Sequence, residues 1–406
     1  MTSLRRFRLL VVSAFTVLFS CAAFAGDPAA VENTKQRIEG LGAAATCVVD
    51  AGGRLTGITI TDGSGVTAAD LVLFGGLPDL EKLQILNCRS LNDAMVAPLA
   101  GLTSLKSLAL TNTALTDDGV RMIAESFPDL VELDLSSNTN LTGAAMKPIV
   151  GLRKLERLSL VQNRFNDLHT RRLSKLAALE LLDLRGNMEA GDMTLGVVGG
   201  LPALRAFKHR STIVGDEGLA KLAESKTLES LFAQDFAITD AAGASLASLT
   251  GLTSLEIFRC QGFGSDGVLA LAPLGKLGRL TLRDLPEVGD PALAVLGKLP
   301  QLKRLYLHEL ASVGDEGLAH LASAKQLEVL DIWSLPRMTD ATVAVIATLP
   351  GLKELSIRET GVTEASLEKI LAMPNLETLT FKNGAVSPAT AAKLAARRWK
   401  KLDLGR

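Results

Sequence analysis

Aliphatic residues recur in a fixed pattern, L-x-x-L-x-L, that returns every 24 or 25 residues from residue 55 almost to the C-terminus. Within the motif apolar and polar positions alternate, which is the period of a strand with one buried face. The fifteen central residues are Ile58, Leu83, Leu108, Leu133, Leu158, Leu182, Phe207, Leu231, Leu255, Leu280, Leu305, Leu330, Leu355, Leu379 and Leu402. A fixed period of this length predicts a solenoid, in which each repeat contacts mainly its neighbours.

Residues 302–325 illustrate one repeat. Leu302, Leu305 and Leu307 alternate with polar residues and predict a strand, a turn follows, and the apolar spacing of 317–322 is helical. Strand, turn and helix in succession form a right-handed coil that pairs its strands in parallel. Helices are wider (about 10 Å) than the strand spacing (about 4.8 Å), so the stack curves with the sheet inside. We therefore expect an α/β horseshoe with a parallel sheet on the concave face and helices on the convex face.

The sequence V-G-D-E-G-L occurs at 214–219 and again at 313–318, at the start of the helical half of the repeat. With the leucine motif, it resembles the leucine-rich-repeat family, and within it the ribonuclease-inhibitor-like and cysteine-containing subclasses, in an exported protein of bacterial type. The resemblance covers about 350 residues. It implies a protein-binding horseshoe without indicating which partner it binds, because one fold supports many functions.

Both ends of the repeat array, which we place at 63–386, are expected to be capped, since an exposed sheet edge invites pairing with another chain. In the N-terminal cap, 26–62, residues 29–42 have the pattern of an amphipathic helix. Residues 46–49 and 55–60 then predict a hairpin that closes the first edge. The C-terminal cap, 387–406, should hold a helix that begins at Ser387-Pro388 and a last strand at 399–404, with Trp399 in the core.

Residues 1–25 have the three parts of an export signal. They comprise a basic segment with Arg5, Arg6 and Arg8, an apolar run at 9–18, and the cleavage sequence Ala-Phe-Ala at 23–25. The apolar run is shorter than the roughly 20 residues that span a bilayer, and no other segment is long enough. We predict export to the periplasm or the medium. Lipidation of Cys21, which ends a lipobox-like sequence, is the alternative.

Cys88 and Cys260 lie five residues after the central strand residue of their repeats. Asparagines fill the same place elsewhere, at Asn138, Asn163 and Asn187. We predict that this position points inward under the turn and that both cysteines are buried thiols. A Cys47–Cys88 disulfide would suit an oxidising compartment and stays open. No Cys or His pair has metal-ligand spacing, so neither metal nor cofactor is predicted.

An aspartate recurs where the helical half of most repeats begins. The positions are Asp93, Asp117, Asp167, Asp192, Asp216, Asp240, Asp266, Asp290, Asp315 and Asp340. A ladder of carboxylates also suggests calcium, but the glycines and acidic residues do not form an EF-hand loop. We predict instead that each Asp caps its own helix by accepting the first free N–H groups.

Stacking fixes the buried positions of a repeat array, so the residues that give such a protein its specific function lie at exposed positions. The net charge is −1, from 43 basic and 44 acidic residues, so the overall charge of the chain does not favour binding to nucleic acid. Aromatics make up only 4% of the chain, yet several fall at outward strand positions. After the last Leu of the motif, the first five repeats carry small, apolar or neutral residues, and basic and aromatic residues follow from the sixth onward. The predicted partner-binding residues are Phe232, Phe258, Arg283, Arg304, Tyr306, His308, Trp333, Arg358 and Lys382.

Tyr, Trp and Arg are enriched at binding hot spots, so we predict a monomeric scaffold for a protein partner. Two alternatives stay open, a binder of carbohydrate or acidic polymer in the cell envelope and a structural envelope protein without a ligand. The same residues also have a purely structural interpretation. Strands favour aromatics, arginines stack on rings, and nearby acids, Asp284, Glu309, Asp331 and Glu359, would neutralise part of the charge.

His209 stands at an inward Leu position, beside a repeat with Ala233 at the matching place. We predict that its ring fills that space, with a pH-sensing role as the alternative. No G-x-S-x-G, H-E-x-x-H or Walker sequence occurs, and the four histidines are scattered. The sequence therefore predicts no enzymatic activity.

Overall fold

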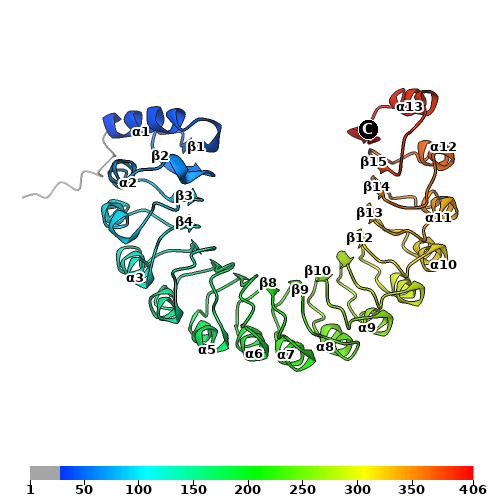
Figure 1. Cartoon of the computed structure of the whole chain (residues 1–406), viewed down its shortest axis with the longest axis horizontal. Helices are drawn as coiled ribbons and strands as arrows, with labels where there is room; N and C mark the ends of the chain where they lie inside the picture. The colour runs from blue at the N-terminus through cyan, green and yellow to red at the C-terminus, as the bar shows by residue number, and fades with distance from the viewer. Residues whose placement is uncertain (1–27, 406) are drawn as a thin grey trace, which may run out of the picture.

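The computed structural model describes residues 28–405. These residues form one open horseshoe with a curved sheet on its inner face and helices on its outer face (Figure 1). The sheet has sixteen strands in sequence order. The predicted fold class is thus confirmed, while the predicted export signal and Cys21 lie outside the described residues.

All neighbouring strands from β2 onward pair in parallel, and the pairing joins the central motif residues one to the next, from Ile58 with Leu83 to Leu379 with Leu402. The strands are β1 (Ala45–Val49), β2 (Leu55–Ile60), β3 (Lys82–Leu86), β4 (Ser107–Thr111), β5 (Glu132–Asp134), β6 (Arg157–Ser159), β7 (Leu181–Asp183), β8 (Ala206–Arg210), β9 (Ser230–Gln234), β10 (Ser254–Phe258), β11 (Arg279–Arg283), β12 (Arg304–His308), β13 (Val329–Trp333), β14 (Glu354–Arg358), β15 (Thr378–Lys382) and β16 (Lys401–Asp403). Because the register is constant, the inward leucines form continuous buried rows.

The outer layer consists of short α- and 3-10 helices. The α-helices are α1 (Pro28–Gly40), α2 (Ala68–Gly75), α3 (Asp117–Ser126), α4 (Met146–Ile149), α5 (Asp167–Thr170), α6 (Asp192–Gly199), α7 (Asp216–Leu222), α8 (Ala242–Ser248), α9 (Ser265–Leu269), α10 (Asp315–Leu318), α11 (Asp340–Ile346), α12 (Leu367–Leu371) and α13 (Pro388–Ala395). The 3-10 helices are η1 (Gly42–Ala44), η2 (Gly63–Gly65), η3 (Asp93–Met95), η4 (Ala97–Gly101), η5 (Gly143–Ala145), η6 (Arg171–Lys175), η7 (Asp290–Lys298), η8 (Ala319–Ser323) and η9 (Glu364–Ser366).

Each end of the sheet is covered by a helix and a strand. At the N-terminal end β1 pairs antiparallel with β2, and Arg37 of α1 forms an ion pair with Asp70 of α2, with 2.6 Å between Nε and Oδ1. At the C-terminal end Ser387 caps α13, and β16 is the last strand. Trp399 packs against the core but is only half-buried, and its Nε1 donates to the Leu394 carbonyl. Trp399 is therefore a boundary residue rather than a fully buried one.

The buried position after each strand holds a ladder of asparagines, as predicted. Asn138 accepts from the backbone N–H of Thr113 (2.8 Å), and Asn163 accepts from the N–H of Asn138 (2.9 Å). Asn187 continues the ladder by accepting from Phe165 N–H. Cys88 and Cys260 are buried at the same place in other repeats. The ladder satisfies turn amides that have no backbone partner in the core.

The aspartate ladder works differently from the prediction that each Asp caps its own helix. In α3 the cap is Thr116, whose hydroxyl accepts from Asp118 N–H, and Asp117 is the first helical residue. The carboxylate of Asp117 instead accepts from the N–H of Thr142 (2.9 Å) in the next repeat. The own-helix prediction was wrong because the residue before the aspartate occupies the cap position, Thr116 in α3 and Gly215 in α7. The aspartate is the first helical residue, and its carboxylate joins consecutive repeats.

Asp266 departs from this ladder. The N–H of Gly289 in the following repeat donates to Ser265 Oγ (2.9 Å), and Asp266 is exposed beside it. At the C-terminal end of the ladder, Glu364 takes the role of the aspartate by accepting from Ser387 N–H (3.0 Å).

Replacing Asp340 by Ala is expected to lower the free energy of unfolding by about 1.5–3 kcal/mol, because its carboxylate accepts three hydrogen bonds from the next repeat. These come from the N–H and hydroxyl of Thr363 and from the hydroxyl of Ser366. Urea denaturation followed by circular dichroism measures the loss. Asp266→Ala is the matched control and should change stability by less than about 0.5 kcal/mol. Equal losses in the two variants would contradict an inter-repeat role.

Candidate partner-binding surface

The outward residues of the strands form three parallel rows on the concave face. We name the row at the ends of the strands the strand-end row, and within it pairing brings Phe258, Arg283, His308, Trp333 and Arg358 side by side on β10 to β14. Phe232 and Tyr306 lie in the middle row, and Arg304 in the row where the strands begin. The fold thus places all nine predicted residues on one face, on the consecutive strands β9 to β15.

Cations and aromatic rings alternate along the strand-end row. The Arg283 guanidinium carbon lies 4.4 Å from the ring centroid of Phe258 and 5.1 Å from that of Trp333. The Arg358 guanidinium carbon lies 5.5 Å from the centroid of the same Trp333 ring. His308 makes edge contacts with Tyr306 and Trp333. These contacts hold otherwise flexible side chains in a fixed arrangement.

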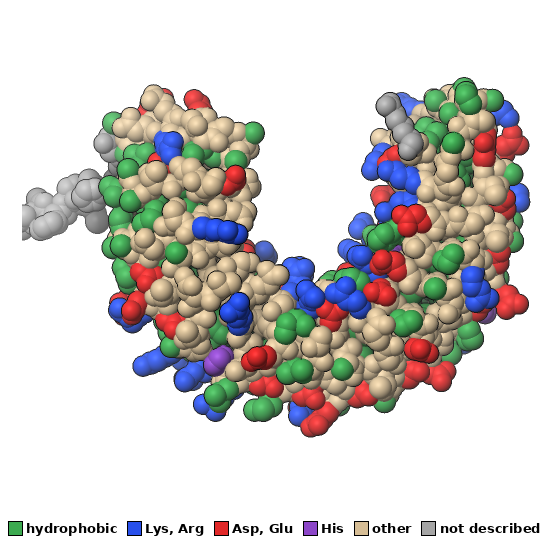
Figure 2. All heavy atoms as spheres, viewed as in Figure 1, with side chains coloured by type: hydrophobic (Ala, Val, Ile, Leu, Met, Phe, Trp, Pro, Cys, Tyr) green, Lys and Arg blue, Asp and Glu red, His purple; other side chains and the backbone are tan. Residues whose placement is uncertain are grey.

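Acidic side chains partner the arginines of this row. Arg283 Nε lies 2.7 Å from Glu309, and Arg358 lies 2.9 Å from Asp331. Burial raises the pKa of Asp331, but the His308 ring, with Nε2 3.5 Å from Oδ2, and the hydrogen bonds from Arg358 outweigh it, so that the pKa is lowered and the carboxylate stays ionised. Figure 2 shows this mixture of blue and red side chains on the inner surface of the C-terminal arm. The structural interpretation of the arginines is thus correct in part, since Glu309 and Asp331 pair with them.

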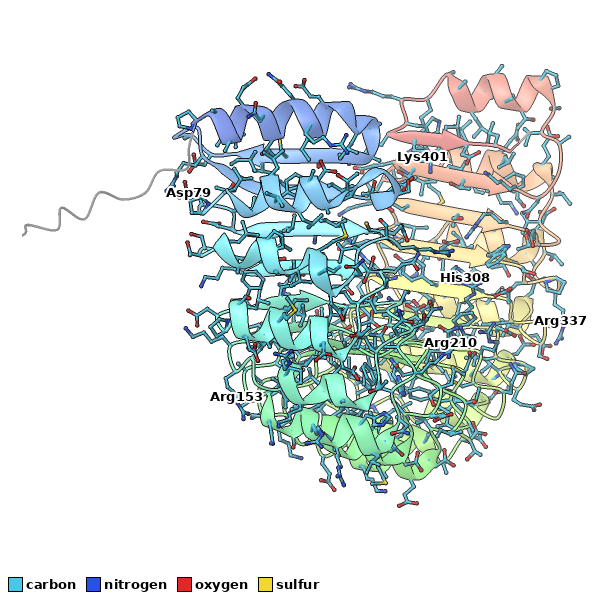
Figure 3. The ribbon with its side chains drawn as sticks, turned by 60° about the vertical axis from the view of Figure 1, so that its left-hand side comes forward. Asp79, Arg153, Arg210, His308, Arg337 and Lys401 are labelled. Carbon is cyan, nitrogen blue, oxygen red and sulfur yellow. The ribbon has the colours of Figure 1, made fainter. Side chains whose placement is uncertain are left out.

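The predicted residues differ in how far they reach into solvent. Lys382 and Arg304 are exposed, and Lys382 pairs with Asp403 at 2.9 Å. The aromatic residues and the remaining cations are half-buried against one another. Figure 3 shows His308 on the sheet of the C-terminal arm, with Arg337 at the rim beyond the strand ends. A partner would therefore meet a largely preformed surface.

A hollow of about 410 Å³ lies beside this row at the C-terminal end of the concave face. Tyr306 and Asp331 line one side, and Ser356 and Thr380 form part of its floor. The sequence prediction missed it because it considered only large side chains. The sequence feature that indicates this hollow is the small size of the middle-row residues on the strands after β12, because small outward residues beside a large one leave space.

Arg259 is a second residue that the prediction missed. It follows Phe258, has a left-handed backbone (φ 54°) and lies 4.8 Å from the Phe258 centroid. Its guanidinium also pairs with Asp235, which pairs with Arg210 as well. Arg259 therefore extends the aromatic–guanidinium row toward β9.

The N-terminal half of the concave face is less neutral than its strand-end residues indicated. A hollow of about 230 Å³ is lined by Glu132, Asp134 and Asp183 together with Lys208. Burial raises the pKa of Asp134, with hydrogen bonds to Ser136 opposing. Asp183 is ion-paired with Arg185 at 2.7 Å. The strand-end position alone does not reveal these carboxylates, because Asp134 and Asp183 lie in the middle row and Glu132 lies in the row where the strands begin.

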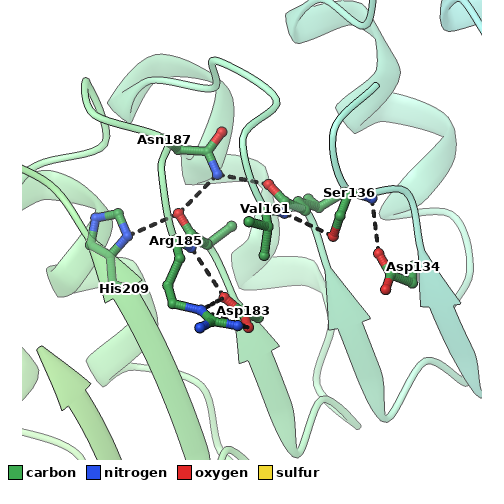
Figure 4. Close-up of polar contacts among 9 residues, drawn as sticks. Asp134, Ser136, Val161, Asp183, Arg185, Asn187 and His209 are labelled. Atoms are coloured by element: carbon green, nitrogen blue, oxygen red, sulfur yellow. Dashed lines mark hydrogen bonds and ion pairs between the residues drawn. The ribbon is translucent and has the colours of Figure 1, made fainter. Parts of the chain in front are cut away.

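His209 fills the core, as predicted. Its ring is completely buried and lies 5.6 Å from the ring of Phe207. Nδ1 lies 3.1 Å from the Leu184 carbonyl, and Nε2 lies 2.8 Å from the Ala190 carbonyl. Figure 4 shows the first of these contacts beside the asparagine ladder at Asn187.

The three cysteines of the described region are free thiols, so the structure forms no Cys47–Cys88 disulfide. Burial raises the pKa of Cys260 to about 12, and its thiol is therefore unreactive. Within residues 28–405, no group of three or more His, Cys, Asp or Glu is arranged to hold a metal ion. No helix of this region is both long and apolar enough to cross a bilayer.

Models of the leucine rich repeat match three segments of the chain, 101–124, 128–188 and 249–272. The horseshoe with its repeated L-x-x-L-x-L strands is accordingly a leucine-rich-repeat solenoid. The comparison with curated proteins gave no significant match.

Solved structures of the same architecture come from distant organisms. An internalin of Listeria monocytogenes is 19% identical over 94% of this chain and 96% of its own, with a TM-score of 0.55. A leucine-rich-repeat protein of Leptospira interrogans is also 19% identical, over 84% and 87%, with a TM-score of 0.51. A chain in the yeast Rad7–Elc1 complex is 17% identical over 89% and 90%, with a TM-score of 0.56. At such identities the similarity concerns the fold alone.

Proposed function

We propose that this chain is an exported, non-enzymatic scaffold that binds a protein partner through the C-terminal half of its concave face. Leucine-rich-repeat proteins generally act as protein-interaction scaffolds, and the yeast structure similar to this chain is that of a complex. The proposed export depends on the signal-like residues 1–25.

The observation that supports this surface most directly is the row formed by Phe258, Arg283, Trp333 and Arg358. A chain with only two Trp and one Tyr places one of each on adjacent strands, facing outward. Ion pairs with Glu309 and Asp331 fix the arginines in advance, so binding costs less side-chain entropy. The hollow next to Tyr306 offers space for one protruding side chain of the partner.

The test is capture of partners from envelope and secreted fractions with the purified chain. A Tyr306→Ala/Trp333→Ala/Arg358→Ala variant is expected to lose at least about tenfold in affinity, since hot-spot truncations cost roughly 2 kcal/mol or more. Circular dichroism checks its folding. The matched control, Leu86→Ala/Arg157→Ala, changes the N-terminal half of the same face and should bind like the wild type.

Salt distinguishes the alternatives. A complex with an acidic polymer should weaken steeply as ionic strength rises, because exposed charges are screened. A protein complex anchored by Trp333 and Tyr306 should weaken much less. Retention of the same partner at unchanged affinity by the folded triple variant would refute the proposed surface.

A further inference from the structure

A second surface lies on the rim where the strands end, outside the concave face. A hollow of about 640 Å³ opens there between two consecutive repeats. Thr142 and Gly143 line it from one repeat, and Arg164, Arg171 and Arg172 are the cations among its lining residues. His169, which also lines the hollow, accepts from Asn166 N–H through Nδ1. None of these residues belongs to the proposed concave site.

The three arginines of this hollow lack the acidic partners that the concave arginines have. Within residues 28–405, no carboxylate forms an ion pair with any of them. Asp167, at the start of α5, accepts through Oδ1 from the N–H groups of Gly191 and Thr194 in the next repeat and pairs with none of these arginines. Clustered cations without counter-ions repel one another, so an anion that entered the hollow would relieve this repulsion.

Exposed apolar side chains continue from the hollow along the rim. Leu168 is 56% exposed, Met193 58% and Ile213 54%, and they belong to three consecutive repeats. Leu168 and Met193 follow the first residue of α5 and α6. Ile213 Cδ1 lies 3.0 Å from the position that a Cβ would take on Gly191, next to α6. Half of the six large hydrophobic residues that are exposed in the described region thus share one strip.

Figure 2 shows the two features together, with Lys and Arg side chains gathered on the outer face near α5 and hydrophobic side chains along the same face toward α7. We define the rim surface as Arg164, Arg171 and Arg172 with Leu168, Met193 and Ile213. We propose that the rim surface binds an acidic segment of a second protein. The acidic side chains of that segment occupy the arginine hollow, and its apolar side chains cover the strip.

The geometry favours a peptide over a lipid surface. The strip presents one exposed apolar side chain in each of three consecutive repeats, which an extended segment can follow. Leu168 and Met193 occupy matching positions, and Ile213 stands at the position that Arg164 takes in its own repeat. The arginines line a shallow hollow of about 640 Å³ that the side-chain carboxylates of a peptide can enter. Arginine also pairs with carboxylates in a bidentate manner. The rim surface is independent of the concave site.

The probe is a short fluorescein-labelled peptide of alternating Glu and Leu, with a Gln–Leu peptide as the neutral comparison. Fluorescence anisotropy should show binding of the acidic peptide to the mature chain and at least about tenfold weaker binding to Arg171→Glu/Arg172→Glu. Leu168→Gln/Met193→Gln should weaken it as well. Arg89→Glu is the control for charge reversal on the same rim outside the hollow, because Arg89 is exposed at the position in its repeat that Arg164 takes in a later one, and it should bind the peptide like the wild type.

Two further measurements distinguish the rim surface from the concave site and a peptide ligand from a lipid ligand. The Tyr306→Ala/Trp333→Ala variant should bind the acidic peptide like the wild type, so failure of the concave proposal leaves this one intact. Vesicles of phosphatidylglycerol and phosphatidylcholine test the lipid alternative. Equal peptide binding by the wild type and Arg171→Glu/Arg172→Glu would overturn the proposal. So would arginine-dependent binding of vesicles without binding of the peptide.

Discussion

Replacement of Asn138 by Leu is expected to lower the free energy of unfolding by about 2–5 kcal/mol, because each buried polar group left without a partner costs about 1–3 kcal/mol. The Asn138 carboxamide makes four hydrogen bonds in a fully buried position. Oδ1 accepts from the N–H (2.8 Å) and hydroxyl of Thr113, and Nδ2 donates to the carbonyls of Leu110 and Leu135. Leucine has the same branching and the same number of side-chain heavy atoms, so most of the expected loss is one of hydrogen bonding, and its larger methyl groups add some overpacking.

The size of the loss in free energy of unfolding depends on which partners of Asn138 keep another hydrogen bond. The Leu135 carbonyl keeps a second donor, Asn163 Nδ2 at 2.8 Å. The N–H of Thr113 and the Leu110 carbonyl lose the Asn138 partner in the core, and so does the Thr113 hydroxyl, which can rotate toward another acceptor. The two backbone groups at the stated cost sum to about 2–6 kcal/mol, which covers the expected range.

Urea denaturation gives the overall loss, and hydrogen exchange shows where it falls, since repeat arrays can open locally. Amides in β4 to β6 should lose protection before those in β12 to β14. Asn140→Leu, at an exposed position of the same turn, is the control and should be nearly neutral. A neutral Asn138→Leu variant would mean that the ladder does not stabilise the fold.

The sequence was sufficient to predict the fold because one feature determines it. Every central residue from Ile58 to Leu402 occupies the same register position, and the register of a sheet with a buried face cannot slip by one residue without exposing that face. The inward position of Asn138 and Cys88 followed from the same period. Where the period was enough, the predictions were correct.

The predictions fell short where contacts between repeats decide the outcome. Asp117 was assigned to its own helix, but its partner is Thr142, a neighbour only after stacking. The rim arginines at 164 and 171–172 belong to one repeat, but the hollow that they line also needs Thr142 and Gly143 of the preceding repeat, which become neighbours only after stacking. The sequence predicted that the outward positions of β9 to β15 align on one face. It predicted only in part which acidic residues pair with the arginines there. The sequence indicates which face a residue occupies more reliably than which atom it contacts.

Replacement of His209 by Ala is expected to lower the free energy of unfolding at pH 7 by about 2–5 kcal/mol, the usual range for a large-to-small change in a core. The imidazole ring is completely buried between Phe207 and Phe236. The shorter contact assigns the N–H to Nε2, which donates to the Ala190 carbonyl at 2.8 Å. The Leu184 carbonyl near Nδ1 already accepts from Asn187 Nδ2, so it does not require a proton from His209. A neutral ring therefore donates to the Ala190 carbonyl only, and its Nδ1 faces the Leu184 carbonyl oxygen without a hydrogen bond.

The pH dependence of stability tests this protonation state. Burial lowers the pKa of His209 below its usual 6.5, against the opposing effect of hydrogen bonds to Ala190 and Leu184. Above about pH 6.5 both folded and unfolded states carry a neutral ring, and His209 contributes no slope. As the pH falls below 6.5, His209 becomes protonated in the unfolded chain but stays neutral in the folded chain. The free energy of unfolding therefore declines. His209→Leu, which restores the residue type usual at this position, should make the decline between pH 7 and 5 shallower, measured by urea denaturation at each pH. A steeper decline in the leucine variant would show that both nitrogens donate and that the folded protein holds a buried imidazolium.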